Sequence, residues 1–202
     1  KQMVMISDAP ALPTQAKVAH MYPGQGSQYV GMTLDLCKRY RVVGETWDEA
    51  DQTMVDILDG ETLSSIVLCE NLSDAELKEA EFKLKQTEYT QPAMLTSDLA
   101  LYRLLDEHGL SPDMVAGHSL GEYAALMVSG ILQFHDALRA AAARGTEMGS
   151  VDVPDKGIMA SVTAPFDVIE KVLDETDGYV IAANKNSPKM TVIAGETAPM
   201  RA

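Results

Sequence analysis

The sequence contains no long apolar run, few cysteines and few basic residues. It has no uninterrupted stretch of about 18 apolar residues and no secretory signal, so we predict neither a membrane span nor export and expect a cytoplasmic protein. Cys37 and Cys69 lack the spacing of metal ligands and are too few for a disulfide scaffold. We therefore expect reduced cysteines and no metal site.

Acidic residues outnumber basic ones. The chain carries 16 Lys and Arg against 30 Asp and Glu, a formal charge of −14, and no basic cluster interrupts this balance. Such a field repels nucleic acid and anionic membranes, so neither is an expected partner. An anionic ligand would need a local device, such as a helix N-terminus or a single placed cation.

The apolar content is sufficient for a core in one or two domains, because 46% of the 202 residues are hydrophobic. Residues 1–16 show no periodicity and carry two prolines, which favours a linker or leader. Residues 17–149 combine predicted strands at 17–23 and 113–118 with predicted helices at about 29–40, 43–59, 72–88, 93–109, 119–129 and 136–148. Ser73 and Glu76 are typical of a capping box at the start of one of these helices.

Residues 150–202 follow a different pattern. They read as a strand at 157–163, a helix at 166–176, and strands at 179–186 and 190–196. This β-α-β-β order is the first part of a ferredoxin-like β-α-β-β-α-β unit. We therefore predict a partial ferredoxin-like subdomain at 150–202, truncated at the C-terminus.

The stretch "GHSLGE", residues 117–122, joins a predicted strand to a predicted helix, which is the context of a nucleophile elbow. Glycines two residues before and after Ser119 allow strand and helix to pack closely around a strained turn. Such a turn exposes the Ser119 hydroxyl at a helix N-terminus and offers the Leu120 N–H to an oxyanion. We favour a nucleophilic serine over an ordinary tight turn.

A second glycine loop, "GQGSQ", occupies residues 24–28. Tyr29 stands where a dinucleotide-binding loop has its third glycine, and no Gly-Lys-Ser/Thr ending follows, so both nucleotide-binding motifs are excluded. Two interpretations remain. The loop is a structural turn, or it directs a backbone N–H, that of Gln25, at the same oxyanion.

Arg144 lies on an apolar stripe of its predicted helix. Helical spacing places it with Ala137, Ala141 and Met148, so we expect a partly buried guanidinium. A buried guanidinium needs a carboxylate or an equivalent partner. The partner is either internal, such as Glu122, or a substrate carboxylate.

Six motifs together resemble one family. "YPGQGSQ", "TQPA", "GHSLGE", "ARG" with its arginine 25 residues after Ser119, "NSP" and "VIAG" are similar in order and spacing to the malonyl/acyl-CoA:acyl-carrier-protein transacylases, over about residues 17–200. The leader resembles that of an acyltransferase domain of a polyketide or polyunsaturated-fatty-acid synthase more than a free-standing enzyme. The resemblance implies an α/β fold: an α/β-hydrolase-like large domain, here 17–149, with an inserted ferredoxin-like small domain.

The resemblance also implies roles for individual residues. It makes Ser119 the acylated nucleophile and assigns the oxyanion hole to the backbone N–H groups of Gln25 and Leu120. Arg144 then binds the carboxylate of a malonyl-type unit. Gln91 and Asn186 match polar positions that line or support the family's site, although turn and core hydrogen bonds explain them equally well.

The family's general base is a histidine downstream of the ferredoxin-like unit. No histidine follows His135 in this chain. We therefore expect the general base to be absent from this sequence and treat all four histidines as structural.

The expected function is transfer of a malonyl-type group from CoA to the phosphopantetheine thiol of an acyl carrier protein through an acyl-serine. No bound cofactor or metal is expected, because CoA enters as a substrate and phosphopantetheine belongs to the carrier. Expected partners are malonyl-CoA or a related acyl-CoA, the carrier protein and neighbouring synthase domains. The alternatives are a serine acyl hydrolase and a non-catalytic docking domain.

Overall fold

The computed structural model describes residues 16–202. The expected leader at 1–16 therefore lies outside the described residues, apart from Ala16. The chain divides after Gly149 into two compact units, called here the first unit and the second unit (Ser150–Ala202). Each is described by itself.

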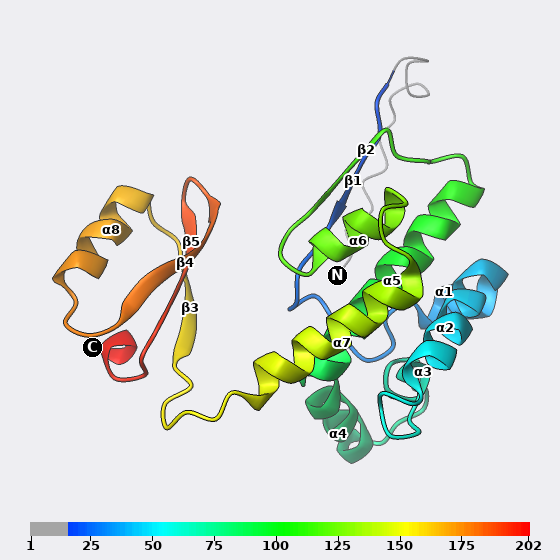
Figure 1. Cartoon of the computed structure of the whole chain (residues 1–202), viewed down its shortest axis with the longest axis horizontal. Helices are drawn as coiled ribbons and strands as arrows, with labels where there is room; N and C mark the ends of the chain where they lie inside the picture. Colours follow the sequence, from blue (N-terminus) through cyan, green and yellow to red (C-terminus); the bar gives the residue numbers. More distant parts are fainter. Residues whose placement is uncertain (1–15) are drawn as a thin grey trace. The chain divides into compact units, whose positions relative to one another are not determined.

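The first unit contains a parallel pair of strands, β1 (Ala19–Tyr22) and β2 (Met114–Gly117), which lie side by side in Figure 1. Ala19 pairs with Met114 and Tyr22 with Gly117, so both strands end at the same edge. Parallel strands need a long crossover connection. Here that crossover contains five helices, and it brings "GQGSQ" (24–28) and "GHSLGE" (117–122), far apart in sequence, to one end of the sheet.

The described part of the first unit also contains seven helices: α1 (Leu34–Arg39), α2 (Arg41–Met54), α3 (Leu63–Val67), α4 (Asp74–Leu84), α5 (Thr87–Glu107), α6 (Gly121–Val128) and α7 (Phe134–Ser150). The central helix is α5 (Figure 1), in which every residue from 90 to 100 is buried. Trp47, Leu95, Leu120 and Leu138 are core residues that join α2, the elbow, α5 and α7. The predicted capping box is confirmed: the Ser73 N–H donates to Glu76 and the Glu76 N–H to the Ser73 hydroxyl.

Two predicted helix starts are wrong. The central helix begins at Thr87 instead of after Pro92, because burial of the segment outweighs the donor that proline lacks. Gln91 is therefore a fully buried helical residue, and not part of a turn. The helix predicted from Tyr29 begins only at Leu34, because Thr33 adopts a left-handed conformation (φ 64°) that breaks the helical path.

The second unit contains β3 (Ile158–Val162), α8 (Phe166–Glu175), β4 (Val180–Ser187), β5 (Met190–Gly195) and the short 3-10 helix η1 (Pro199–Arg201). Its three strands form an antiparallel sheet in the order β3-β5-β4, with β5 in the centre. The chain thus has the mixed α/β class that the sequence predicts. Along residues 16–202, no helix is both long and apolar enough to cross a membrane.

Candidate active site

Ser119 lies in the turn between the end of β2 at Gly117 and the start of α6 at Gly121. Its backbone adopts φ 53°, a left-handed conformation that is uncommon for residues other than glycine. The residue is exposed. A strained turn that presents a hydroxyl to solvent at a helix N-terminus is the geometry of a nucleophile elbow.

The two glycines of the elbow are sterically required. A Cβ on Gly117 would overlap the Gly121 carbonyl, and a Cβ on Gly121 would overlap the Tyr22 carbonyl at the end of β1. Real Cβ atoms do not approach backbone so closely. The strand-turn-helix arrangement that exposes Ser119 therefore depends on the absence of side chains at these two positions.

We expect Gly121→Ala to destabilise the protein by about 3 kcal/mol, because α6 must move away from β1 to admit the methyl group. The matched control is Gly44→Ala in α2, where a Cβ would meet only the Cys37 carbonyl at 3.8 Å. Alanine there should stabilise the helix by about 0.5–1 kcal/mol. Urea denaturation measures both changes; equal stability of Gly121→Ala and wild type would contradict the steric account.

The Leu120 N–H lies at the start of α6. The hydrogen bonds of the turn use the next two N–H groups: Gly121 donates to the His118 carbonyl at 2.9 Å and Glu122 to the Ser119 carbonyl at 3.1 Å. The Leu120 side chain is fully buried and anchors the turn in the core. Its N–H, at the positive end of the helix, can serve as a donor to an anion.

The glycine loop lies against the elbow. A Cβ on Gly24 would be 3.1 Å from the His118 carbonyl oxygen and 3.5 Å from the Ser119 Cβ. Gly26 has φ 121°, and its N–H donates to the Gln28 side chain at 2.8 Å. Gln25 stands between these two glycines, so its backbone N–H belongs to a loop segment adjacent to Ser119.

Arg144 is half-buried on α7 and is held by Gln91. Its Nη1 donates to the Gln91 Oε1 at 2.8 Å, and the Gln91 Nε2 lies 3.5 Å from the Met148 Sδ. Gln91 is fully buried. The amide therefore supports one edge of the guanidinium without neutralising its charge.

Close packing of the two helices explains this contact. Gly145 lies against Thr87 at the start of α5, where the Thr87 hydroxyl donates to the Gly145 carbonyl at 2.7 Å. A Cβ on Gly145 would lie 2.6 Å from the Thr87 carbonyl oxygen. Glycine at this position thus brings α7 near enough to α5 for Arg144 to reach Gln91.

The internal ion pair with Glu122 is not formed. The ion pairs of the described residues do not include one between Arg144 and Glu122, and Glu122 is exposed. The predicted apolar stripe is confirmed at Ala137 and Ala141, which are buried, but not at Met148, which is exposed. Arg144 is a cation that a neutral amide holds in place, so its guanidinium can donate hydrogen bonds to the carboxylate of a ligand.

None of the four histidines hydrogen-bonds to Ser119 in the described part of the chain. His20 stacks edge-on against Tyr22 and Tyr102, and the His108 Nδ1 lies 2.8 Å from the Leu104 carbonyl. His135 is exposed beside Asp136, and His118 is exposed in the elbow itself. A histidine base from outside this sequence stays a prediction.

Asn186 belongs to the second unit. It lies in β4 where the pairing with β5 shifts register between Lys185 and Ser187, and it is exposed. The interpretation as a core hydrogen-bonder is therefore wrong, whereas its part in a substrate site stays a prediction. Within residues 16–202 there is also no group of three or more His, Cys, Asp or Glu that could hold a metal.

Comparison with known proteins identifies the family. The family model described as "Acyl transferase domain" matches residues 19–202. The chain belongs to this acyl transferase family. It is 40% identical over 181 residues to the malonyl CoA-acyl carrier protein transacylase of Escherichia coli O157:H7, covering 88% of this chain and 54% of that enzyme.

Relatives within the family are of two kinds. Polyketide synthase GfsA of Streptomyces halstedii is 37% identical over 181 residues, which is 89% of this chain and 2% of that synthase. The crystal structure of MCAT from Streptococcus pneumoniae superimposes with a TM-score of 0.76 at 42% identity, covering 92% of this chain and 57% of that one. The chain thus spans about half the length of these transacylases.

Proposed function

We propose that this acyl transferase domain moves a malonyl group from CoA to an acyl carrier protein through an ester on Ser119. The observation that carries the proposal is the elbow: an exposed serine at φ 53° between β2 and α6, beside a second glycine loop. The transacylase from Escherichia coli, named for malonyl-CoA and acyl carrier protein, supports the choice of substrates.

The proposed chemistry has two displacements. The Ser119 Oγ attacks the thioester carbonyl, its proton passes to a base, and the carbon–sulfur bond breaks to release CoA, which takes up the proton as a thiol. The phosphopantetheine thiol of the carrier then attacks the serine ester, the carbon–oxygen bond breaks, and Ser119 regains its proton. No oxidant, metal or bound cofactor is required for this balance.

Two features of the first unit suit the charges in these steps. Each displacement passes through an oxyanion, for which the N–H groups of Leu120 and Gln25 are the proposed donors. Arg144 would bind the free carboxylate of the malonyl group. A positive guanidinium held by a neutral amide supports this role, because the chain is strongly acidic and must attract an anion locally.

We also assign the two units to the family's subdomains. The first unit, with its parallel strand pair and elbow, fits an α/β-hydrolase-like core, and the β3-β5-β4 antiparallel order of the second fits a ferredoxin-like unit. The chain is 40% identical to a transacylase and 37% identical to a polyketide synthase. Because these identities are similar, a position beside other synthase domains stays a prediction.

The main rival function is a serine acyl hydrolase, which would share the elbow but would not need Arg144. Loading the full-length protein with malonyl-CoA and then offering a holo acyl carrier protein separates the two. We expect the malonyl group to move to the carrier thiol faster than it is released as free malonate. Predominant release to water would favour the hydrolase, and failure to load at all would favour the docking domain.

Gln91→Leu tests whether the amide positions Arg144. We expect malonyl loading to fall about 10- to 100-fold, because a hydrogen bond to a charged group is lost, while acetyl loading changes little. The expected loss is in malonyl affinity, read as a raised KM. Gln52→Leu, at an exposed site on α2, is the control. Equal losses with malonyl and acetyl would indicate a purely structural role for Gln91.

A further inference from the structure

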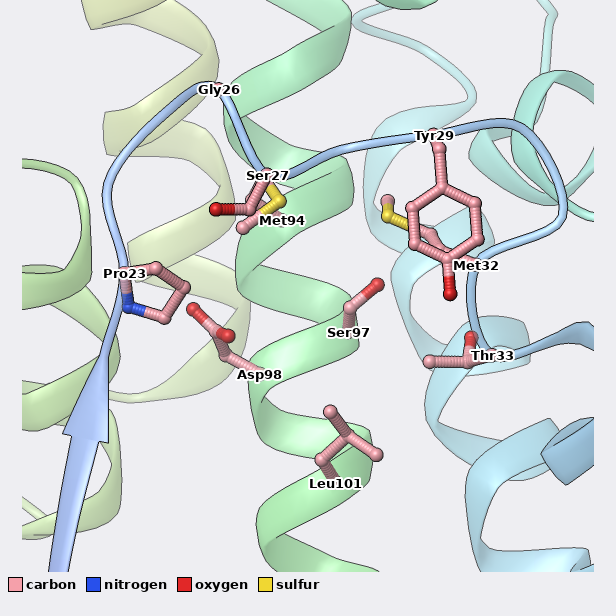
Figure 2. Close-up of a pocket in the computed structure, with 10 residues that line it drawn as sticks. All are labelled: Pro23, Gly26, Ser27, Tyr29, Met32, Thr33, Met94, Ser97, Asp98 and Leu101. Atoms are coloured by element: carbon pink, nitrogen blue, oxygen red, sulfur yellow. The ribbon is translucent and has the colours of Figure 1, made fainter. Parts of the chain in front are cut away.

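A cavity of about 450 Å³ lies beneath the glycine loop, on α5 (Figure 2). Its roof is the segment from Pro23 to Thr33, which is held at both ends. Gly24 lies against the elbow, and at the other end the Trp47 indole N–H donates to the Thr33 hydroxyl at 2.9 Å. The side chains of Pro23, Met94 and Leu101 give the cavity apolar walls.

Two buried polar groups in this cavity have no partner. Ser97 and Asp98 on α5 are each 6% exposed, and neither the Ser97 Oγ nor the Asp98 Oδ2 has a hydrogen bond among the described residues. Figure 2 shows the Asp98 carboxyl extending toward the Pro23 side of the loop and the Ser97 hydroxyl toward Tyr29. Buried polar groups without partners are rare and costly, so these two indicate a site for a ligand with a hydrogen-bond donor.

The charge of the lining defines the ligand. None of the described residues that line the cavity is basic and Asp98 is acidic, so the charge of the lining disfavours an anion such as CoA or malonate. A divalent metal needs several oxygen ligands, whereas Asp98 is the one carboxylate present and residues 16–202 contain no metal-binding cluster. We propose that this cavity binds a compact organic ammonium ion, with its charged group on Asp98 and its apolar body against Met94 and Leu101.

The state of the Asp98 carboxyl supports the proposal. Burial raises its pKa to about 7, because the ionised form is deprived of water and no cation lies nearby to compensate. Asp98 also lines a neighbouring cavity together with Tyr22 from β1 and Tyr102 from its own helix, and neither tyrosine supplies a positive charge. An ammonium ion would supply the missing charge and the missing donor together.

Benzylammonium chloride is a suitable probe, and benzyl alcohol is its neutral counterpart of similar shape. We expect saturable binding of benzylammonium to the 202-residue chain in two-dimensional NMR titrations, with shifts at the amides of Gly26, Ser27 and Thr33. Benzyl alcohol should bind at least about tenfold more weakly, because it lacks the charge.

Asp98→Asn keeps the shape of the side chain and removes its charge, and should weaken benzylammonium binding about tenfold or more. Glu107→Gln, exposed on the same helix, is the matched control and should bind as wild type does. Asp98→Ala also removes the charge and provides a second variant, with a similar expected loss, should Asp98→Asn not fold.

Three results would overturn the proposal. The first is no saturation by benzylammonium, which would mean that the cavity holds water alone, and the second is equal affinity in wild type and Asp98→Asn. The third is chemical-shift changes confined to Ala19 and Met21, which line a neighbouring cavity. The readout is binding and involves no acyl transfer. A failure to detect transacylase activity would therefore not contradict the proposed ammonium site. A failure to detect ammonium binding would likewise not contradict the proposed transacylase activity.

Discussion

Replacement of Ser119 with alanine is expected to abolish the covalent malonyl adduct. Wild-type protein mixed with malonyl-CoA should gain the mass of one malonyl group, and Ser119→Ala should gain none, because no other group would carry the ester. The measurement is intact-protein mass spectrometry on the full-length polypeptide that contains these residues, followed by peptide mapping. The effect is all-or-none, since the residue that forms the bond is removed.

Ser129→Ala is the matched control for this experiment. Ser129 is an exposed serine just after α6, and its hydroxyl contacts only the Leu126 carbonyl of that helix. We expect it to load as wild type does. An adduct that persists in Ser119→Ala would show that the elbow does not carry the nucleophile, and would remove the main support for the proposed transfer.

Replacement of Arg144 with alanine is expected to change substrate preference more than any other single substitution. A charged hydrogen-bonded pair left half-made costs about 2–5 kcal/mol, so malonyl loading should fall roughly 30- to several-thousand-fold in kcat/KM. Acetyl-CoA has no carboxylate to lose and should be affected much less. The quantity to measure is the malonyl-to-acetyl ratio of serine acylation rates in wild type and Arg144→Ala.

Arg139→Ala is the control, because Arg139 is exposed on the same helix, α7. It should leave the ratio unchanged. Thermal melting of both variants separates a folding defect from a binding defect. If Arg144→Ala lowers malonyl and acetyl loading by the same factor, its role is structural, and a malonyl-type substrate loses its main support in this chain.

The elbow could be predicted from the sequence because its causes are local. The spacing of Gly117, Ser119 and Gly121 after a strand and before a helix determines where side chains can be tolerated, and the structure shows the same close approaches. The strand order and most of the helix order could be predicted for the same reason, whereas the short helix α3 was missed. Two helix starts were predicted wrongly: the helices begin at Thr87, where burial of the segment decides the backbone, and at Leu34, after the left-handed Thr33.

The partner of Arg144 could not be predicted from the sequence. Gln91 lies 53 residues away, on a segment that local rules assign to a turn, and only burial within α5 turns its amide toward the guanidinium. Sequence reasoning also missed Ser97 and Asp98. The one signal was a polar pair inside the apolar run "AMLTSDLAL", which an amphipathic helix explains equally well.

The sequence by itself thus determined the family, the mixed α/β class and the serine elbow, because periodicity, glycine sterics and motif order act over short stretches of chain. Tertiary structure alone decided which groups are left without partners. Packing of α7 on α5 gives Arg144 an amide in place of an ion pair, and the roof formed by the glycine loop buries Asp98 beside an open cavity. These pairings depend on contacts between segments that are distant in sequence. The free-energy cost of an unpaired polar group depends on how far those segments bury it and which partners they offer.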